Sequence, residues 1–251
     1  MSGPADVTPA ELAALVRPHL GDALVAFDVD GVLAPVVDDA DHAELPPGVR
    51  DGLAELGERT MVGIVSGRSL ESLERSFGFP DQVHVIGSHG LEVRGDGAPV
   101  LDDDEQYTYD QLEIIATRGV GAAGDGAWLE YTPASVVLHT RDADPTLAAP
   151  AVEAVTNLAR MIDGAQVRPG GAAVELLARA ASKVDAVLDL AGRHERSPVV
   201  YLGDDAADED AFRGMSGADI SVRVGPGDSV AAHRLPGPHA VAEFVSLLTS
   251  P

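Results

Sequence analysis

Short apolar runs without polar alternation recur along the chain, and they constrain its fold more than any other feature. The clearest are residues 23–27, 61–65, 83–86 and 199–202. An apolar run of this length is typical of a strand buried on both faces of a parallel sheet. Between the first three runs, residues 49–56 and 70–77 have the apolar spacing and the end signals of helices. This alternation predicts an α/β fold with a doubly wound parallel sheet.

The alternation of strands and helices changes from about Asp102. The later segments predict a helix, two β-hairpins and a second helix between the hairpins. These elements are expected at 104–118, 127–131 with 135–141, 146–162, and 165–168 with 172–177. They form an antiparallel α+β unit inserted into the parallel fold. We therefore expect a core made of 1–101 and 179–251, with an inserted cap domain at 102–178.

Composition limits the partners and cofactors of the chain. Its 251 residues include no cysteine and carry a formal charge of −24. Such a charge would repel a phosphate backbone, which argues against nucleic acid or an anionic membrane as partner. Without thiolates any metal is held by oxygen or imidazole, which favours Mg²⁺. No apolar run could span a bilayer and the first residues lack signal-peptide regions, so we expect a soluble cytoplasmic protein.

Polar residues whose side chains could bind a ligand or react follow several predicted strands. Asp28 and Asp30 come directly after the first strand, where ligands bind in open parallel sheets. Alone, this pair suits a turn or a calcium loop equally well. Ser66 could donate to a phosphate oxygen and Lys183 could neutralise its charge, although a helix cap and a surface lysine are the ordinary alternatives. Together with Asp204, these groups favour a Mg²⁺ and phosphate site over separate turns.

Taken together, these residues resemble the four motifs of the haloacid dehalogenase superfamily of phosphatases. The motifs stand here as Asp28-Val29-Asp30-Gly31-Val32, Ser66, Lys183 and Gly203-Asp204-Asp205. Further stretches resemble the trehalose-6-phosphate phosphatases of that superfamily, namely residues 64–68, 87–92, 203–212, 222–225 and 230–235. The resemblance covers nearly the whole chain. It implies a Rossmann-like core with an inserted cap.

The resemblance also implies a reaction, the hydrolysis of trehalose 6-phosphate in trehalose biosynthesis. Asp28 would attack phosphorus to form an aspartyl-phosphate, and Asp30 would protonate the departing sugar oxygen and then activate water. Ser66 and Lys183 would complete the catalytic set. The implied Mg²⁺ ligands are Asp28, the Asp30 carbonyl and Asp204, with Asp205 and Asp208 beside them. Gly67, Arg68 and His89 would bind substrate.

The predicted cap strands place polar side chains on one sheet face. Strand alternation puts Trp128 and Glu130 together, and it puts His139 and Arg141 together on the next strand. A one-sided sheet shows polar residues to solvent anyway, but as a group Glu130, His139, Arg141 and Glu175 suit recognition of sugar hydroxyls. The chain lacks the lysine that the family commonly carries shortly after the position of Glu130. This departure leaves the identity of the sugar more open than the chemistry.

Three functions are therefore compared. The first is hydrolysis of trehalose 6-phosphate, with a trehalose-phosphate synthase-like enzyme acting in the same pathway. The second is the same chemistry on another disaccharide-like phosphate. The third is a non-catalytic partner of a sugar-phosphate synthase, which the intact set of Asp28, Asp30, Lys183 and Asp204 argues against.

Overall fold

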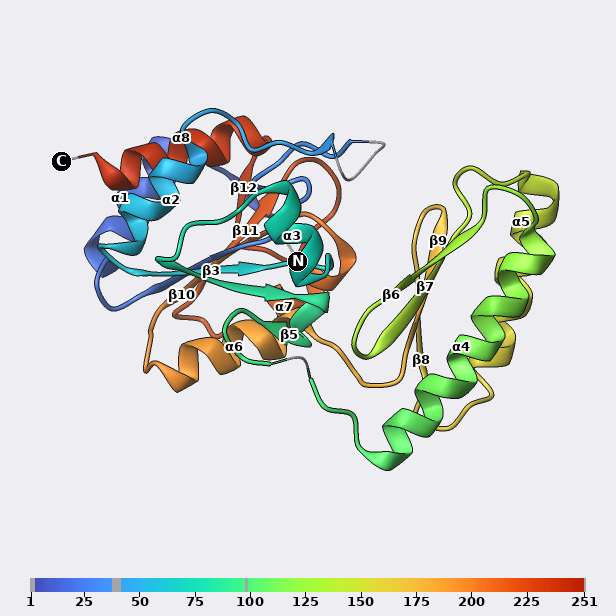
Figure 1. Cartoon of the computed structure of the whole chain (residues 1–251). Helices are drawn as coiled ribbons and strands as arrows, with labels where there is room; N and C mark the ends of the chain where they lie inside the picture. The colour runs from blue at the N-terminus through green and yellow to red at the C-terminus, as the bar shows by residue number, and fades with distance from the viewer. Residues whose placement is uncertain (1–2, 38–41, 98, 251) are drawn as a thin grey trace. The chain divides into compact units, whose positions relative to one another are not determined.

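A computed structural model describes residues 3–37, 42–97 and 99–250 of the chain. The chain divides into two compact units, and the second is inserted into the first. Unit 1 consists of Met1–Gly97 and Ser182–Pro251, and unit 2 consists of Ala98–Ala181. Figure 1 shows unit 2 in green to yellow, between the two segments of unit 1 along the chain.

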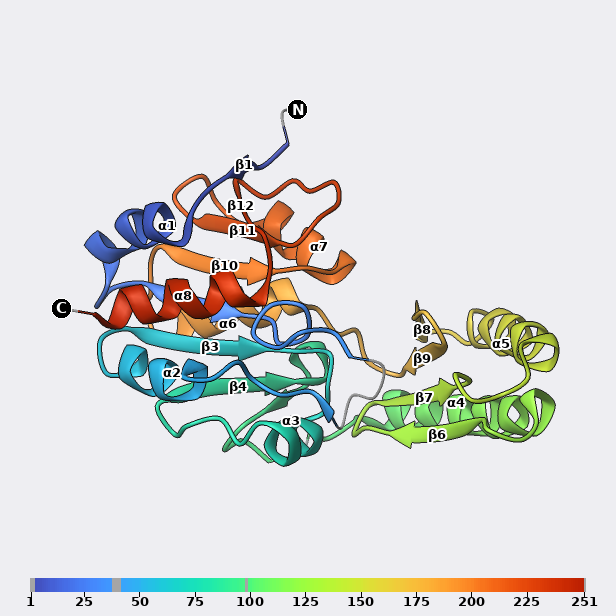
Figure 2. The ribbon, with the colours of Figure 1, turned by 90° about the horizontal axis from the view of Figure 1, so that it is seen from above.

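Unit 1 contains an eight-stranded sheet in the order β1-β12-β11-β10-β2-β3-β4-β5. All neighbouring strands are parallel except β4 and β5, which are antiparallel. Figure 2 shows the order of the labelled strands across the unit. The strands are β1 (Ala5–Asp6), β2 (Leu24–Phe27), β3 (Met61–Val65), β4 (Val83–Gly87), β5 (Glu92–Val93), β10 (Val199–Gly203), β11 (Ile220–Val224) and β12 (His233–Leu235). The predicted α/β class is confirmed.

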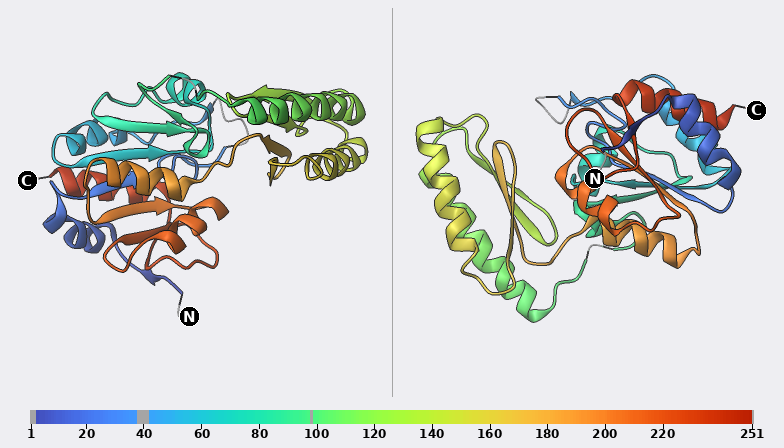
Figure 3. Two further views of the ribbon diagram at one scale, coloured as in Figure 1. Left: turned by 90° about the horizontal axis from the view of Figure 1, so that it is seen from below. Right: turned by 180° about the vertical axis from the view of Figure 1, so that it is seen from behind.

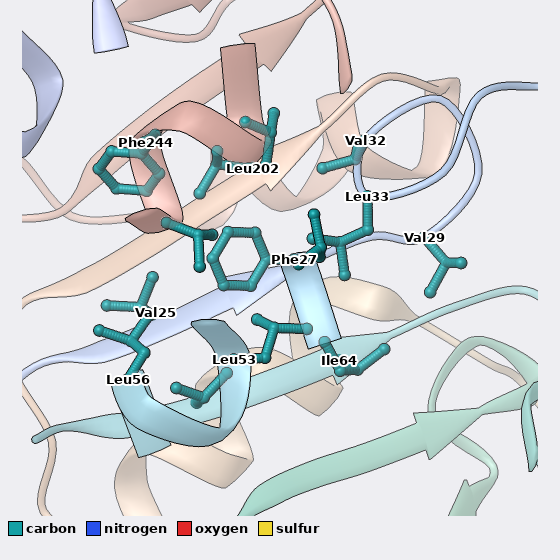
Figure 4. Packing of buried hydrophobic residues seen from close by; sticks show 14 of the residues in the cluster. Val25, Phe27, Val29, Val32, Leu33, Leu53, Leu56, Ile64, Leu202 and Phe244 are labelled. Carbon is teal, nitrogen blue, oxygen red and sulfur yellow. The ribbon is translucent and has the colours of Figure 1, made fainter. Parts of the chain in front are cut away.

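Helices cover both faces of this sheet, because its central strands are apolar on both sides. On one face α1, α2 and α8 pack together, and on the other α6 packs beside α7 (Figure 1). Phe27 and Ile64 point towards the first group, where they meet Leu53 and Phe244 (Figure 4). The helices are α1 (Pro9–Val16), α2 (Val49–Gly57), α3 (Leu70–Ser76), α6 (Lys183–Arg193), α7 (Ala206–Gly214) and α8 (Pro238–Thr249), with 3-10 turns η1 (Arg17–His19) and η3 (Ser88–Gly90).

Local signals determine where several helices begin. The Thr8 hydroxyl accepts from the Glu11 amide and caps α1, and the Glu11 carboxylate accepts from the Thr8 amide, which completes a capping box. The cap of α3 is Ser69, whose hydroxyl accepts from the Ser72 amide at 3.3 Å. Ser66 is therefore not the cap of this helix. Its side chain is left for another role.

Unit 2 is a four-stranded antiparallel sheet with two helices on one face. The strand order is β6-β7-β9-β8. The elements are α4 (Asp103–Ala123), β6 (Trp128–Tyr131), β7 (Ser135–His139), α5 (Pro145–Ala159), β8 (Gln166–Pro169) and β9 (Ala173–Leu177). The helices α4 and α5 lie side by side in both views of Figure 3, against Val136 and Leu138 of β7. The predicted hairpins and helices are confirmed, although α4 runs five residues beyond the predicted end at 118.

Among the residues that the structure describes, no helix combines the length and the apolar character needed to cross a membrane.

Candidate active site

The sheet order brings three predicted site residues to neighbouring strand ends. Strand β2 lies between β10 and β3, and Phe27 is in register with Leu202 on one side and with Ile64 on the other. Because these strands are parallel, Asp28, Ser66 and Asp204 begin adjacent loops at the same edge of the sheet. Asp28 is buried and its amide donates to the Leu202 carbonyl at 2.9 Å. The loop that begins at Asp28 is thus anchored to the neighbouring strand β10.

Lys183, the only lysine of the chain, lies at the centre of an acidic cluster. Its Nζ is 2.8 Å from Asp28 Oδ2, 3.0 Å from Asp205 Oδ2 and 3.0 Å from Asp208 Oδ1. The lysine side chain is 1% exposed, although α6 begins at this residue. One buried ammonium group therefore faces three carboxylates, of which those of Asp28 and Asp208 are also buried.

The charges in this cluster are unbalanced. Burial raises the pKa of Asp28 well above its ordinary value, Lys183 opposes that rise, and Asp208 and Asp205 add to it. Burial lowers the pKa of Lys183, but the three carboxylates outweigh burial and raise that pKa above its ordinary value, so the amine stays charged. Three carboxylates around one ammonium group leave an excess of negative charge. A further cation would lower the free energy of the ionised cluster.

Asp208 organises the loop after β10. Its Oδ1 accepts from Lys183 and, at 2.7 Å, from the Tyr201 hydroxyl. Its Oδ2 accepts from the Asp204 amide at 2.7 Å and from the Asp205 amide at 3.0 Å. Sequence analysis did not identify Tyr201, which lies in the apolar strand β10. Its hydroxyl in an otherwise apolar run was the only signal available.

Asp204 lies against the first loop, which has room for it only because of a glycine. A Cβ on Gly31 would be 2.0 Å from Asp204 Oδ2, and Gly31 has φ +77°. Within the described parts of the chain, no hydrogen bond reaches the Asp204 carboxylate. Burial, followed by the charges of Asp208 and Asp205, raises the pKa of Asp204 to about 7.

The donor set suits a hard divalent cation. Ligand oxygens of Asp28, Asp205 and Asp208 lie within 4.8 Å of one another, but the Lys183 ammonium already contacts all three. Asp204 is not among the carboxylates that Lys183 contacts, and it adjoins the loop that begins at Asp28. All of these ligands are oxygen atoms, as Mg²⁺ prefers. The acidic oxygen ligands present therefore fit a hard divalent cation.

Asp30 forms a two-bond ion pair with Arg68. Arg68 Nε donates to Asp30 Oδ2 at 2.7 Å, and Nη2 donates to Oδ1 at 2.6 Å. The guanidinium group also lies 5.2 Å from the centre of the Phe77 ring. The Arg68 side chain is only 10% exposed, so the pair is partly desolvated. The structure thus brings together an acid and a cation that the sequence places 38 residues apart.

The loop after β3 is held by the loop after β4. The His89 amide donates to the Ser66 carbonyl at 2.9 Å, and the Ser88 amide donates to the Arg68 carbonyl at 2.8 Å. Both Ser88 and His89 have positive φ, at 48° and 55°. A Cβ on Gly67 would be 2.6 Å from His89 Nε2, so the imidazole packs directly against that backbone. Ser66 is 1% exposed and its Oγ accepts from the Arg68 amide at 3.2 Å.

The predicted residues of unit 2 form two separate contacts on its sheet. His139 Nε2 lies 2.9 Å from Glu130 Oε2, across β6 and β7. Arg168 Nη1 donates to Glu175 Oε2 at 2.8 Å, across β8 and β9. Arg141 follows the end of β7 and is exposed. Sequence analysis placed Trp128 on this face without assigning it to the site. In the structure it stacks on His139.

Comparisons with known proteins identify related chains. A family model described as trehalose-phosphatase matches residues 26–243. A trehalose-phosphate phosphatase of Mycobacterium ulcerans is 32% identical over 259 residues, which cover 96% of this chain and 66% of that protein. The chain thus spans slightly less than two thirds of this relative.

Solved structures share the fold. The C-terminal domain of a C. albicans trehalose-6-phosphate phosphatase superposes with a TM-score of 0.77 at 24% identity, covering 99% of this chain and 98% of that one. The C-terminal domain of a Candida albicans trehalose synthase regulatory protein gives a TM-score of 0.73 at 14% identity, covering 99% and 100%. At these identities the likeness concerns the fold alone.

Proposed function

Because the chain belongs to the trehalose-phosphatase family, we propose that it hydrolyses trehalose 6-phosphate to trehalose and phosphate. The single observation that supports this most strongly is the buried Asp28 carboxylate held 2.8 Å from Lys183 Nζ. A structural turn has no need of a buried aspartate paired with the only lysine of the chain. A nucleophile that must approach an anionic phosphate does need a cation beside it.

The proposed reaction transfers the phosphoryl group twice. An Asp28 oxygen forms a bond to phosphorus while the bond between phosphorus and the sugar oxygen breaks, and Asp30 gives its proton to that oxygen. Water then attacks phosphorus while the bond between phosphorus and the Asp28 oxygen breaks. One water proton passes to Asp30, phosphate leaves, and the Asp28 carboxylate is regenerated. Arg68 holds both oxygens of Asp30 in this structure, so proton transfer requires that this pair opens. Ser66 and Lys183 are proposed to bind the phosphate oxygens.

We propose Mg²⁺ as the cofactor, held by Asp28, the Asp30 backbone carbonyl and Asp204. When bound it would supply positive charge that screens Asp28 from the phosphate dianion. The excess negative charge around Lys183 and the raised pKa of Asp204 support this assignment. Asp205 and Asp208 are proposed to orient the site through Lys183 and the backbone of the Asp204 loop.

We propose that unit 2 is the cap predicted at residues 102–178, and that it recognises the sugar. The polar contacts of Glu130, His139 and Glu175 support this role. Gly67, Arg68 and His89 are proposed to bind the phosphate end of the substrate. The supply of substrate by a trehalose-phosphate synthase-like enzyme and the cytoplasmic location stay predictions.

Phosphate release from a panel of sugar phosphates, with Mg²⁺ or with EDTA, tests this function. We expect trehalose 6-phosphate to give the highest kcat/KM and EDTA to abolish release. Asp28→Asn should lower kcat by a factor of at least about 10³. The control Asp189→Asn, at an exposed position on α6, should leave kcat unchanged.

The other outcomes separate the competing functions. Preference for a different disaccharide-like phosphate would replace the proposed substrate and keep the chemistry. No release from any member of the panel by the folded chain would contradict the phosphatase and favour the non-catalytic partner of a synthase.

A further inference from the structure

One face of the unit 2 sheet carries polar and aromatic side chains, whereas the other face packs on α4 and α5. On β7 the two sets alternate, because Val136 and Leu138 are fully buried while Val137 and His139 are partly exposed. We name the second set the open sheet face, defined by Trp128, Glu130, Val137, His139, Arg168 and Glu175. It belongs entirely to unit 2.

An aromatic stack lies at one end of this face. Trp128 and His139 are paired in register across β6 and β7, and their rings are 4.0 Å apart at an angle of 9°. The imidazole is also held by Glu130, at 2.9 Å from its Nε2. The His139 ring is thereby restrained on one face by the indole and at Nε2 by Glu130. The indole is positioned by its neighbour, and it needs no ligand to become ordered.

Trp128 is nevertheless 50% exposed. The imidazole covers one face of the indole, so much of the remaining aromatic surface contacts water. An aromatic ring has a negative face that attracts weakly positive C–H groups, and the apolar side of a pyranose ring presents several of them. A large exposed aromatic ring that is already fixed in place is therefore a suitable platform for a sugar.

The charged side chains of the open sheet face are held by neighbours on the same face. Glu130 contacts His139, and Glu175 accepts from Arg168 at 2.8 Å and from the Ser135 hydroxyl at 2.7 Å. A carboxylate oxygen accepts hydrogen bonds from hydroxyl groups, so Glu130 is complementary to a polyhydroxyl ligand.

From these observations we propose that Trp128, positioned by His139, stacks on a glucosyl ring of the substrate and contributes to the choice of sugar. This inference rests on the proposed function, because it assigns one part of the proposed substrate to the open sheet face. Trp128 acts here as a binding residue and His139 as its positioning residue.

The chain contains a single tryptophan, so its fluorescence reports on this residue alone. We would titrate the full chain with trehalose, and the Asp28→Asn variant with trehalose 6-phosphate, which that variant should not consume. We expect a saturable change in emission with both sugars and none with inorganic phosphate. The concentration of trehalose 6-phosphate that gives half of the emission change should match its KM in the active chain.

Kinetics of substituted chains provide a second readout. Trp128→Leu should raise KM for trehalose 6-phosphate about three- to tenfold with kcat within about twofold, and Trp128→Phe should raise it less. The matched control is Tyr131→Leu. Tyr131 lies on the same strand with 52% exposure, but strand alternation places it on the helix side of the sheet, and KM should not change. Thermal melting of each variant checks folding independently of activity.

Failure of this inference and failure of the proposed function give different results. If the wild-type chain hydrolyses trehalose 6-phosphate but Trp128 emission does not change at a saturating concentration of the sugar, the stacking is contradicted and the function stands. If the chain rejects trehalose 6-phosphate but another disaccharide phosphate changes the emission, the substrate is wrong and the stacking stands. A change that depends only on protein concentration would identify a second copy as the occupant and contradict the proposal.

Discussion

Lys183 illustrates how a single residue couples stability to chemistry. It is 1% exposed and is the only ammonium group that contacts Asp28, Asp205 and Asp208 within the described residues. A buried charge is tolerated when it is paired and hydrogen-bonded, and removing one partner leaves the others uncompensated. The residue that is proposed to assist phosphoryl transfer therefore also holds together the loop ends on which the transfer depends.

Replacement of Lys183 should cost both stability and activity. Lys183→Met should lower the free energy of unfolding by about 3–5 kcal/mol, because three carboxylates lose their shared cation. Urea denaturation in EDTA measures this loss. Arg193→Met on the same helix is the control, since its pair with Asp189 is exposed and should contribute within about 1 kcal/mol. Equal stability of the two variants would show that Lys183 is not the cation that the cluster requires.

Gly31 should be needed for the position of Asp204 and not only for its backbone angle. Gly31 and Gly48 have similar φ, at +77° and +83°, but nothing lies within 4 Å of a Cβ at Gly48. Alanine at either position should destabilise the chain by roughly 1–2 kcal/mol. Only Gly31→Ala should also displace Asp204, which should reduce kcat/KM by about a hundredfold.

Phosphate release and thermal melting of the two glycine variants provide the comparison. If both variants lost activity equally, or if neither did, the contact between Gly31 and Asp204 would have no part in function.

Sequence reasoning predicted candidate residues for the site but not the partners that those residues have in the structure. The motif residues are recognisable because each follows a strand or begins a helix. The pairing of Asp30 with Arg68, the Tyr201 hydroxyl on Asp208 and the Trp128–His139 stack depend on how strands are ordered and how side chains turn. No spacing along the chain contains that information, since these contacts form between separate loops and strands.

At the scale of elements, an ion pair connects the two ends of unit 2. Arg179, just after β9, donates from Nε to Glu105 Oε1 at 2.7 Å and from Nη2 to the Val100 carbonyl at 2.8 Å. Glu105 also completes the capping box that begins α4 at Asp102. The segments that enter and leave unit 2 are thereby joined to each other and to the start of its longest helix.

This connection should make the stability of unit 2 depend on pH in a defined range. Hydrogen bonds from Arg179 and the Asp102 amide lower the pKa of Glu105 to about 2. A carboxyl group whose pKa is lowered on folding stabilises the fold above its unfolded pKa, which is near 4.5 for Glu. That stabilisation is lost as pH falls through about 2. Glu105→Gln should therefore lower the melting temperature at pH 7. The decrease should be smaller at pH 3.

The control for this prediction is Arg118→Met, an exposed change on the same helix. It should not alter the melting temperature at either pH. A difference between wild type and Glu105→Gln that stayed constant from pH 7 to pH 3 would contradict the assignment of the shift to this pair.

Long elements were predictable and short ones were not. The apolar runs and helix end signals located β2, β3, β10, α2, α3 and α5 to within a few residues. The nine-residue helix α7 was not predicted. The two- and three-residue strands β1, β5 and β12 were missed. Such strands carry too little periodicity to be seen in a sequence, because their pairing is decided by the sheet edge that they join. The length of α4 beyond residue 118 was missed for a related reason, since Gly119 and Gly121 suggest an end that packing on α5 overrides.

At the scale of the whole molecule, the two units have different proposed tasks. Unit 1 contains the carboxylates and the lysine proposed for phosphoryl transfer, and unit 2 contains the open sheet face proposed for the sugar. A net charge of −24 repels anions in general, so binding of a phosphate requires local cations, for which Lys183 and the proposed Mg²⁺ are the candidates. The dependence on added Mg²⁺ should accordingly be complete.

The central claim is that Asp28 accepts the phosphoryl group. The most direct measurement is acid quench of the Mg²⁺-loaded chain during turnover of trehalose 6-phosphate, followed by mass spectrometry of its peptides. We predict a phosphoryl group on the peptide that contains Asp28, absent from the Asp28→Asn variant. Rapid phosphate release with no phosphoryl group on that peptide, or with the group on another residue, would contradict the account.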